Sequence, residues 1–264
     1  MLGSIIGDIV GSTYEFHNIK TKQFPFFTEG SDFTDDSVLS LAIARWLLEA
    51  KDEWPTRYLL ESVKAYPHPM GEYGLRFSDW VKEASLTGNA LPYNSCGNGS
   101  AMRVGPVGWA FESEAEVLDA AERSALCTHN HPEGVKGAKV TALCIWMARH
   151  KATKKEICET VEKQFGYDLH FTCNDIRGTY AWDATCQGTV PQAIVAFLDG
   201  KDFEDSIRNA ISIGGDSDTL ACITGSMAEA FYGIPAAIRS EAITYLTPDL
   251  KAVLHEFEDR YGWG

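Results

Sequence analysis

Two short segments that lie far apart in the chain each combine hydroxyl side chains with two carboxylates. The first reads Thr-Asp-Asp-Ser at residues 34–37, and the second reads Gly-Gly-Asp-Ser-Asp-Thr at residues 214–219. Carboxylate and hydroxyl oxygens are hard ligands that suit Mg²⁺ or Mn²⁺ better than zinc. Four carboxylates brought together would repel one another, and a bound cation relieves that repulsion. If the fold joins the two segments, they predict a divalent-cation site.

Helix capping is the alternative for each of these segments taken alone. Each one precedes a helical pattern, so its hydroxyl can cap the helix and its acids can interact with the macrodipole. Acids two residues apart do not face each other on a regular helix, but they can converge in a turn that leads into one. Neither segment fits an EF-hand, which needs a longer acidic loop and a distal Glu.

Two other segments carry groups that could act on a ligand. Glu15 lies near the end of the segment GDIVGSTYEF at residues 7–16, where a surface acid is the alternative. Residues 94–103, NSCGNGSAMR, contain small side chains that permit a close approach of the backbone. Backbone N–H groups that lead into a helix favour phosphate, and a plain loop is the alternative here.

The segment THNHP at residues 128–132 suggests a capping Thr and a histidine, His129, that faces a ligand. A metal site formed by Cys127, His129 and His131 is disfavoured, because no fourth ligand is spaced nearby. Pro132 also suits the first turn of a helix at this point.

Helical periodicity dominates the elements that must position these groups. It predicts a first helix rich in glycine and further helices over 35–50, 114–127, 132–150, 154–165, 190–199, 202–213, 217–232, 235–246 and 248–260. The only strand signal is the alternation in residues 167–172, and no Rossmann or P-loop motif occurs. Loops are expected over 17–33, 66–74 and 88–100. The sequence therefore predicts one all-α domain, residues 1–264, with about ten helices.

Composition excludes several classes of partner. The chain has 23 Lys and Arg against 37 Asp and Glu, a net charge of −14. No basic face for nucleic acid is visible, and the densest lysines, at 151, 154 and 155, lie among glutamates on an expected solvated helix face. No apolar run is long enough for a membrane helix. Seven cysteines without a CxxC pair and the absence of a signal-peptide pattern predict free thiols and a cytoplasmic protein.

Taken in order, these segments resemble the ADP-ribosylglycohydrolase family. The resemblance runs from GDIVGSTYEF through FTDDS, GNGSAMRVGPVG and THNHPEGVKGA to GGDSDT and AFYGIP, and so covers most of the chain. The pairing of the two acidic motifs is its most specific part. The resemblance implies an orthogonal all-α bundle with a binuclear centre of two Mg²⁺ or Mn²⁺ ions. It implies six metal ligands: Thr34, Asp35, Asp36, Asp216, Asp218 and Thr219.

The same resemblance implies roles for other residues. Glu15 matches an acid assigned to acid/base work, and Asp35, Asp36 and Asp218 are the further catalytic candidates. Substrate contacts are implied for Gly97, Asn98, Gly99, Ser100, His129, Tyr73 and Gly74. Ser37 stands where many members have a second Thr, so the hydroxyl is kept. The chain is short between its motifs, which leaves the surface that recognises the acceptor undefined.

The expected reaction is hydrolysis at C1 of the distal ribose of ADP-ribose, with an oxocarbenium-like transition state. The expected partner is an ADP-ribosylated protein or a small ADP-ribose conjugate. Arginine is slightly favoured as the acceptor, and serine-linked or O-acetyl ADP-ribose are the other options. Two alternatives differ in class: a two-metal nucleotide phosphoesterase, and a non-catalytic ADP-ribose-binding or structural relative.

Overall fold

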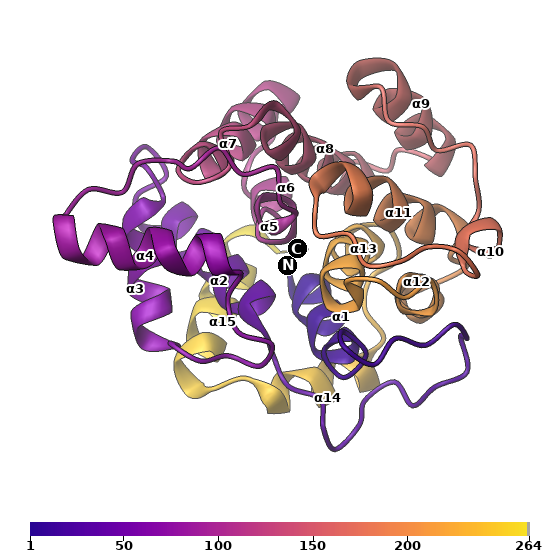
Figure 1. Ribbon diagram of the computed structural model, residues 1–264. Helices are drawn as coiled ribbons and strands as arrows, with labels where there is room; N and C mark the ends of the chain where they lie inside the picture. Colours follow the sequence, from indigo (N-terminus) through magenta and orange to yellow (C-terminus); the bar gives the residue numbers. More distant parts are fainter. Residues whose placement is uncertain (263–264) are drawn as a thin grey trace.

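The computed structural model describes residues 1–262, which form fifteen helices and no strand (Figure 1). In chain order the helices are α1 (Leu2–Ser12), α2 (Asp35–Glu49), α3 (Thr56–Ala65), α4 (Leu75–Thr87), α5 (Gly99–Met102), α6 (Val107–Ala110), α7 (Glu114–Leu126), α8 (Pro132–Arg149), α9 (Lys154–Phe165), α10 (Cys173–Ile176), α11 (Cys186–Asp199), α12 (Phe203–Ser212), α13 (Ser217–Tyr232), α14 (Ala236–Tyr245) and α15 (Pro248–Tyr261). The all-α prediction is confirmed. The helix count was too low because α3, α4 and three one-turn helices were not predicted.

Helices α1 and α13 lie at the centre of the molecule, and their backbones touch. A Cβ atom on Gly7 would lie 1.9 Å from the carbonyl oxygen of Ala221, and one on Gly225 would lie 2.1 Å from that of Gly3. Side chains larger than hydrogen therefore do not fit at these crossings. The contacts run in opposite directions along the two helices, so the end of α1 meets the beginning of α13.

The other helices surround this central pair. Helix α2 packs against α1, α3 and α15, and α8 packs against α5, α6, α7 and α11. Helices α11 and α12 cover α13. The result is a shell of helices in which the start of α2 lies beside Asp8 in the middle of α1, and the start of α13 lies beside Gly11 near its end.

The predicted strand at 167–172 is wrong. These residues are irregular up to Thr172, which caps α10. The alternation reflects burial, because Tyr167 and Leu169 are buried and Asp168 and His170 are exposed. One face of a single extended segment packs against the helices, so the pattern of a strand arises without a partner strand.

The lysine-rich helix α9 is only partly a solvated face. Lys155 is exposed and pairs with Glu159 at 3.6 Å, as predicted. Lys154 turns inward instead: its Nζ donates to the carbonyl oxygen of Leu198 at 2.8 Å and lies 5.3 Å from the centre of the Phe197 ring. The aliphatic stem of a lysine can be buried in this way while its ammonium finds carbonyl partners.

All seven cysteines are free thiols, in agreement with the prediction. Among residues 1–262, none of the helices has the length and apolar character needed to cross a membrane.

Candidate active site

The two acidic segments meet at one cavity of about 800 Å³. Its walls include Asp35 and Asp36 from α2, and Asp216, Asp218 and Thr219 from the start of α13. Glu15, from the loop after α1, lies on the same wall. The cavity has the size typical of a small-molecule site. The antiparallel contact of α1 and α13 thus joins segments that sequence spacing alone could not connect.

The carboxylates form two overlapping groups within this cavity. Oxygen atoms of Asp8, Asp36 and Asp218 lie within 4.8 Å of one another, and so do oxygens of Glu15, Asp216 and Asp218. Asp35 lines the cavity but belongs to neither group. The hydroxyl of Thr219 donates to Asp36 Oδ2 at 3.2 Å, which links the two acidic motifs directly.

Electrostatics in the cavity are strongly unfavourable for so many charges. Burial raises the pKa of Asp36 and of Asp218 well above the usual range, and neighbouring carboxylates raise it further. Burial likewise raises the pKa of Asp35, and the charges of Asp8, Asp216 and Glu15 add to this effect. The pKa of Glu15 rises to about 8, mainly through burial and then through Asp216 and Asp8.

The residues present fit a divalent cation. Asp36 Oδ1 and Asp218 Oδ1 are buried and have no hydrogen-bond partner among the described residues. Buried carboxylate oxygens without a donor are rare, because leaving them unpaired costs several kcal/mol. A cation between the two groups would satisfy these oxygens and remove the mutual repulsion.

Asp8 is a site residue that the sequence analysis did not identify. It accepts the backbone N–H groups of Thr34 and Ser37, both at 3.0 Å, and the hydroxyls of the same two residues. It therefore fastens the start of α2 to the middle of α1. Burial raises its pKa to about 6, although these four bonds oppose the rise. The signal was a carboxylate inside a helix that is otherwise apolar, where an acid is rarely buried without partners.

These bonds also explain the hydroxyls of the first motif. The Thr34 hydroxyl donates to Asp8 at 2.6 Å and accepts the N–H of Asp36 at 3.2 Å. One lone pair of its oxygen stays available to a cation. The Ser37 hydroxyl donates to Asp8, so a serine serves this position as well as a threonine.

Glu15 is held in place from two sides. A Cβ atom on Gly71, whose φ is +78°, would lie 2.7 Å from Glu15 Oε2, so a glycine is needed where the 66–74 loop meets this carboxylate. Asn18 accepts the N–H of Gly215 at 2.7 Å and donates to the carbonyl oxygen of Glu15 at 2.9 Å. Asn18, which the sequence analysis also missed, thus ties the Glu15 loop to the turn before Asp216.

The glycine loop lies beside the acidic end of the cavity. Gly97, Asn98 and Gly99 line the cavity, and Asn98 Nδ2 donates to Asp216 Oδ2 at 2.7 Å. The Ser100 side chain is turned away, since its buried hydroxyl donates to the carbonyl oxygen of Gly134 at 2.7 Å. Only the backbone of Ser100 is left to serve a ligand.

The remaining predicted contacts line the same cavity. His129 is buried with one ring edge against the glycine loop, and Tyr73 and Gly74 also line the cavity. The Tyr73 hydroxyl is occupied, because it donates to the carbonyl oxygen of Tyr66 at 2.7 Å. Tyr73 therefore offers a ligand its ring rather than its hydroxyl.

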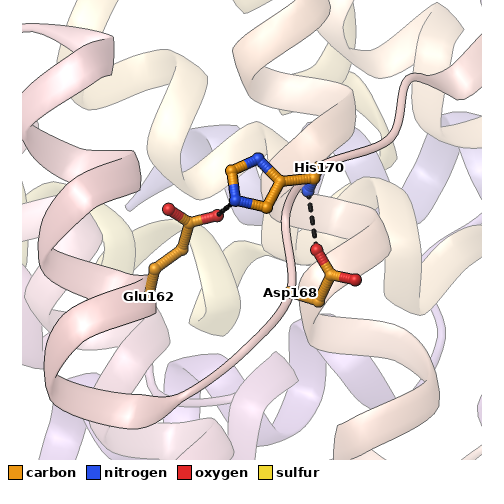
Figure 2. A group of neighbouring side chains, drawn as sticks. All are labelled: Glu162, Asp168 and His170. Carbon is orange, nitrogen blue, oxygen red and sulfur yellow. Dashed lines mark hydrogen bonds and ion pairs between the residues drawn. The ribbon is translucent and has the colours of Figure 1, made fainter.

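A third group of potential ligands lies away from the cavity, on the last turn of α9 and the segment after it. Figure 2 shows Glu162, Asp168 and His170, whose ligand atoms also lie within 4.8 Å of one another. Asp168 and His170 are exposed. None of the three belongs to the cavity wall, and the sequence analysis did not select them.

Comparison with known proteins identifies the family of this helical, acid-lined fold. The family model of ADP-ribosylglycohydrolases matches residues 1–262, so the chain belongs to that family and is a hydrolase. Human ADP-ribosylhydrolase ARH3 is 26% identical over 89% of this chain and 84% of its own length. The ADP-ribosylarginine hydrolase Tri1 of Pseudomonas putida is also 26% identical, over 89% of this chain and 70% of its own.

A solved structure described as an ADP-ribosylglycohydrolase-related protein complex has the same fold. It aligns with a TM-score of 0.74 and 25% identity, covering 98% of this chain and 95% of the other. The resemblance seen in the sequence motifs is confirmed.

Proposed function

We propose that the protein releases ADP-ribose from a modified acceptor in a reaction that depends on two divalent cations. Thr34, Asp35, Asp36, Asp216, Asp218 and Thr219 would hold two Mg²⁺ or Mn²⁺ ions. Such ions, when bound, orient the hydroxyls of the distal ribose and lower the pKa of water. One observation carries the proposal: Asp36 and Asp218 both line a ligand-sized cavity, and each has a buried carboxylate oxygen without a hydrogen-bond partner among the described residues.

Glu15 is the residue placed to move the proton. Burial, followed by the charges of Asp216 and Asp8, raises its pKa to about 8 in the cation-free cavity. Bound cations would offset these two charges, so burial is the cause that favours a protonated Glu15 in the loaded site. In the proposed reaction the bond between C1 and the acceptor atom breaks, and the acceptor takes the proton from Glu15. The oxygen of water joins C1, and Glu15 takes the proton that this water releases. The carboxyl group of Glu15 is thereby protonated again, as it was before the reaction.

The acceptor that we propose is arginine. Phe16 directly follows Glu15, and its ring stacks on Trp182 with 5.7 Å between centroids and 15° between planes. Both rings line the cavity, and both are exposed, Phe16 to 65% and Trp182 to 49%. A planar guanidinium binds well on an exposed aromatic face, whereas a serine linkage offers no comparable group. The relative Tri1 is named for arginine, which agrees with this choice.

Tyr14, the residue before Glu15, does not contribute to the choice of acceptor. Its hydroxyl donates to the carbonyl oxygen of Pro25 at 3.1 Å, and its ring packs against Phe24. Tyr14 is not among the residues of the cavity wall. It therefore supports the Glu15 loop from behind and does not contact an acceptor.

The test is a release assay on proteins that bear arginine-linked or serine-linked ADP-ribose, with Mg²⁺, with Mn²⁺ and with EDTA. Metal-dependent release from the arginine conjugate is the expected result. Release from the serine conjugate alone would overturn the choice of acceptor. If EDTA leaves the rate unchanged, the metal dependence is wrong. Binding of ADP-ribose without turnover of any conjugate would favour the non-catalytic alternative, and release of phosphate from nucleotides would favour a phosphoesterase.

A further inference from the structure

Arg103 is a buried cation without a carboxylate partner among the described residues. It has no exposed surface, and no ion pair to it occurs within residues 1–262. One amino group donates to the carbonyl oxygen of Ser124 at 2.7 Å and to the hydroxyl of Thr128 at 2.8 Å. The other two nitrogens, Nε and Nη1, have no partner. A buried guanidinium without a counter-ion is costly, so we expect Arg103 to have a role other than a structural ion pair.

The hydroxyl of Thr128 links Arg103 by hydrogen bonds to His129, a residue of the cavity wall. This hydroxyl is fully buried and already accepts from Arg103. Two described acceptors lie within reach of its proton: Nδ1 of His129, at 2.7 Å, and the sulfur of Cys127, which is the weaker acceptor. If Nδ1 instead carried a proton and donated to Thr128, the buried Thr128 proton would be left with only the weak sulfur acceptor of Cys127. The bonding pattern therefore makes Nδ1 of His129 an acceptor.

The protonation state of the other ring nitrogen of His129, Nε2, follows from this. Burial lowers the pKa of His129 well below its usual value, and the charges of Arg103 and Arg76 lower it further. A neutral imidazole carries one proton, and with Nδ1 accepting, that proton lies on Nε2. Nε2 faces the glycine loop: a Cβ atom would lie 3.2 Å from it on Gly99 and 3.5 Å from it on Gly97.

We propose that Arg103 and Thr128 are positioning residues that fix His129 as an Nε2–H donor toward an anionic oxygen of the ligand. The ligand chemistry rests on the proposed function, in which the glycine loop receives the diphosphate of ADP-ribose. The other tautomer would present a lone pair to a phosphate oxygen and repel it. Arg103 thus selects the tautomer, while its own buried charge adds attraction for the anion.

The decisive measurement is the ¹⁵N NMR spectrum of His129 in the free, full-length protein. We expect Nε2 to carry the proton and Nδ1 to show the shift of an unprotonated acceptor. Because no ligand is present, this result does not depend on the proposed function. A proton on Nδ1 would overturn the inference even if ADP-ribose binds well. Failure of ADP-ribose to bind, with the proton on Nε2, would instead overturn the proposed function and leave the tautomer assignment intact.

Variants of Thr128 test the link to binding. Thr128→Val keeps the shape but removes the hydroxyl, so the Nδ1–H form should appear and the affinity for ADP-ribose should fall about tenfold, the value of one good hydrogen bond to a charged group. Affinity for adenosine, which lacks phosphate, should not change. Thr128→Ser restores the hydroxyl and should restore both properties.

A matched control comes from Thr141 in α8. Thr141 is buried and its hydroxyl has no partner among the described residues, so Thr141→Val makes the same change away from the cavity. It should leave the His129 spectrum and the affinity as they are. If Thr128→Val behaves like this control, with Nε2–H and the affinity unchanged, the positioning role is wrong.

Discussion

Two groups of acidic residues in this molecule have similar spacing but opposite surroundings. In the cavity, oxygens of Asp36 and Asp218 lie within 4.8 Å of their neighbours, and each residue has a buried oxygen without a partner. On the surface, Glu162, Asp168 and His170 are equally close together (Figure 2). There Asp168 accepts the N–H of His170 at 2.9 Å, and His170 pairs with Glu162 at 3.2 Å.

The difference shows that proximity alone does not define a metal site. Exposed charges are stabilised by water, and an exposed ion pair contributes about 0–1 kcal/mol. Buried carboxylates lose that solvation and have raised pKa values unless a counter-charge is supplied. The buried Glu162 Oε1 also lacks a hydrogen bond, but it has the ring nitrogen of His170 at 3.2 Å as an ion-pair partner. No basic side chain forms an ion pair with Asp36 or Asp218 among the described residues, so the cavity carboxylates require a counter-charge from outside the chain. The predictions below test this contrast.

The largest effect is expected from the cavity carboxylates. Asp36→Asn should lower the rate of ADP-ribose release by more than about 100-fold, because even partners one step beyond a metal ligand are worth 10- to 100-fold. The free energy of unfolding in EDTA should not fall, since the change removes one of several repelling charges. Steady-state release assays and chemical denaturation measure the two quantities. Asp168→Asn, in the surface group, is the matched control; full turnover by folded Asp36→Asn protein would contradict the metal-centred mechanism.

Metal removal should reveal the repulsion as a pH dependence of stability. In EDTA, the folded protein holds protons more tightly than the unfolded chain, because the pKa values of Asp8 and Glu15 rise to about 6 and about 8. Stability is therefore greatest at low pH within this window and falls as pH rises from about 4 to about 8. Calorimetric melting temperatures should decline over this range, and saturating Mg²⁺ should flatten the decline near neutral pH.

A control for that experiment is the double variant Glu162→Gln with Asp168→Asn, which lowers the surface charge without touching the cavity. It should keep the same dependence on pH in EDTA. A melting temperature that rises between pH 5 and 8 in the absence of metal would show that the cavity carboxylates do not repel one another in solution.

The sequence predicted most of the helices and the acidic residues of the cavity wall. It did not predict the contacts that hold these residues in place. Helical periodicity located most of the long helices but not α3 and α4, and the two acidic motifs with Glu15 marked the cavity wall. The role of Asp8 was not predicted, because it depends on Thr34 and Ser37 reaching it across the contact of α1 with α2. Residues 167–172 were wrongly predicted to form a strand. Their alternation arose because Tyr167 and Leu169 pack on one side of the segment, without a partner strand.

A smaller effect is expected at the mouth of the cavity. Trp182→Ala should lower kcat/KM for arginine-linked ADP-ribose about tenfold, since stacking of a cation on an aromatic ring is worth about 1–2 kcal/mol in a partly desolvated site. Turnover of a serine-linked conjugate, if any is measurable, should change far less. Trp54, which is 54% exposed and lies outside the cavity, provides the control variant Trp54→Ala. An equal loss with both conjugates would assign Trp182 to ADP-ribose rather than to the acceptor.

The smallest effect should come from the surface group itself. His170→Ala removes the ion pair with Glu162, yet the side chain of His170 is 82% exposed and water can replace it. The free energy of unfolding should change by less than about 0.5 kcal/mol, and release of ADP-ribose should continue at the same rate. Denaturation with and without Mg²⁺, Mn²⁺ or Zn²⁺ measures the first quantity. A different result would contradict this contrast: one of these metals stabilises the EDTA-washed protein, and His170→Ala abolishes the gain. The surface group would then bind a metal despite the contacts among its own side chains. With the expected result, the difference between the two groups is that Glu162 Oε1 has His170 beside it, whereas the buried oxygens of Asp36 and Asp218 have no basic partner.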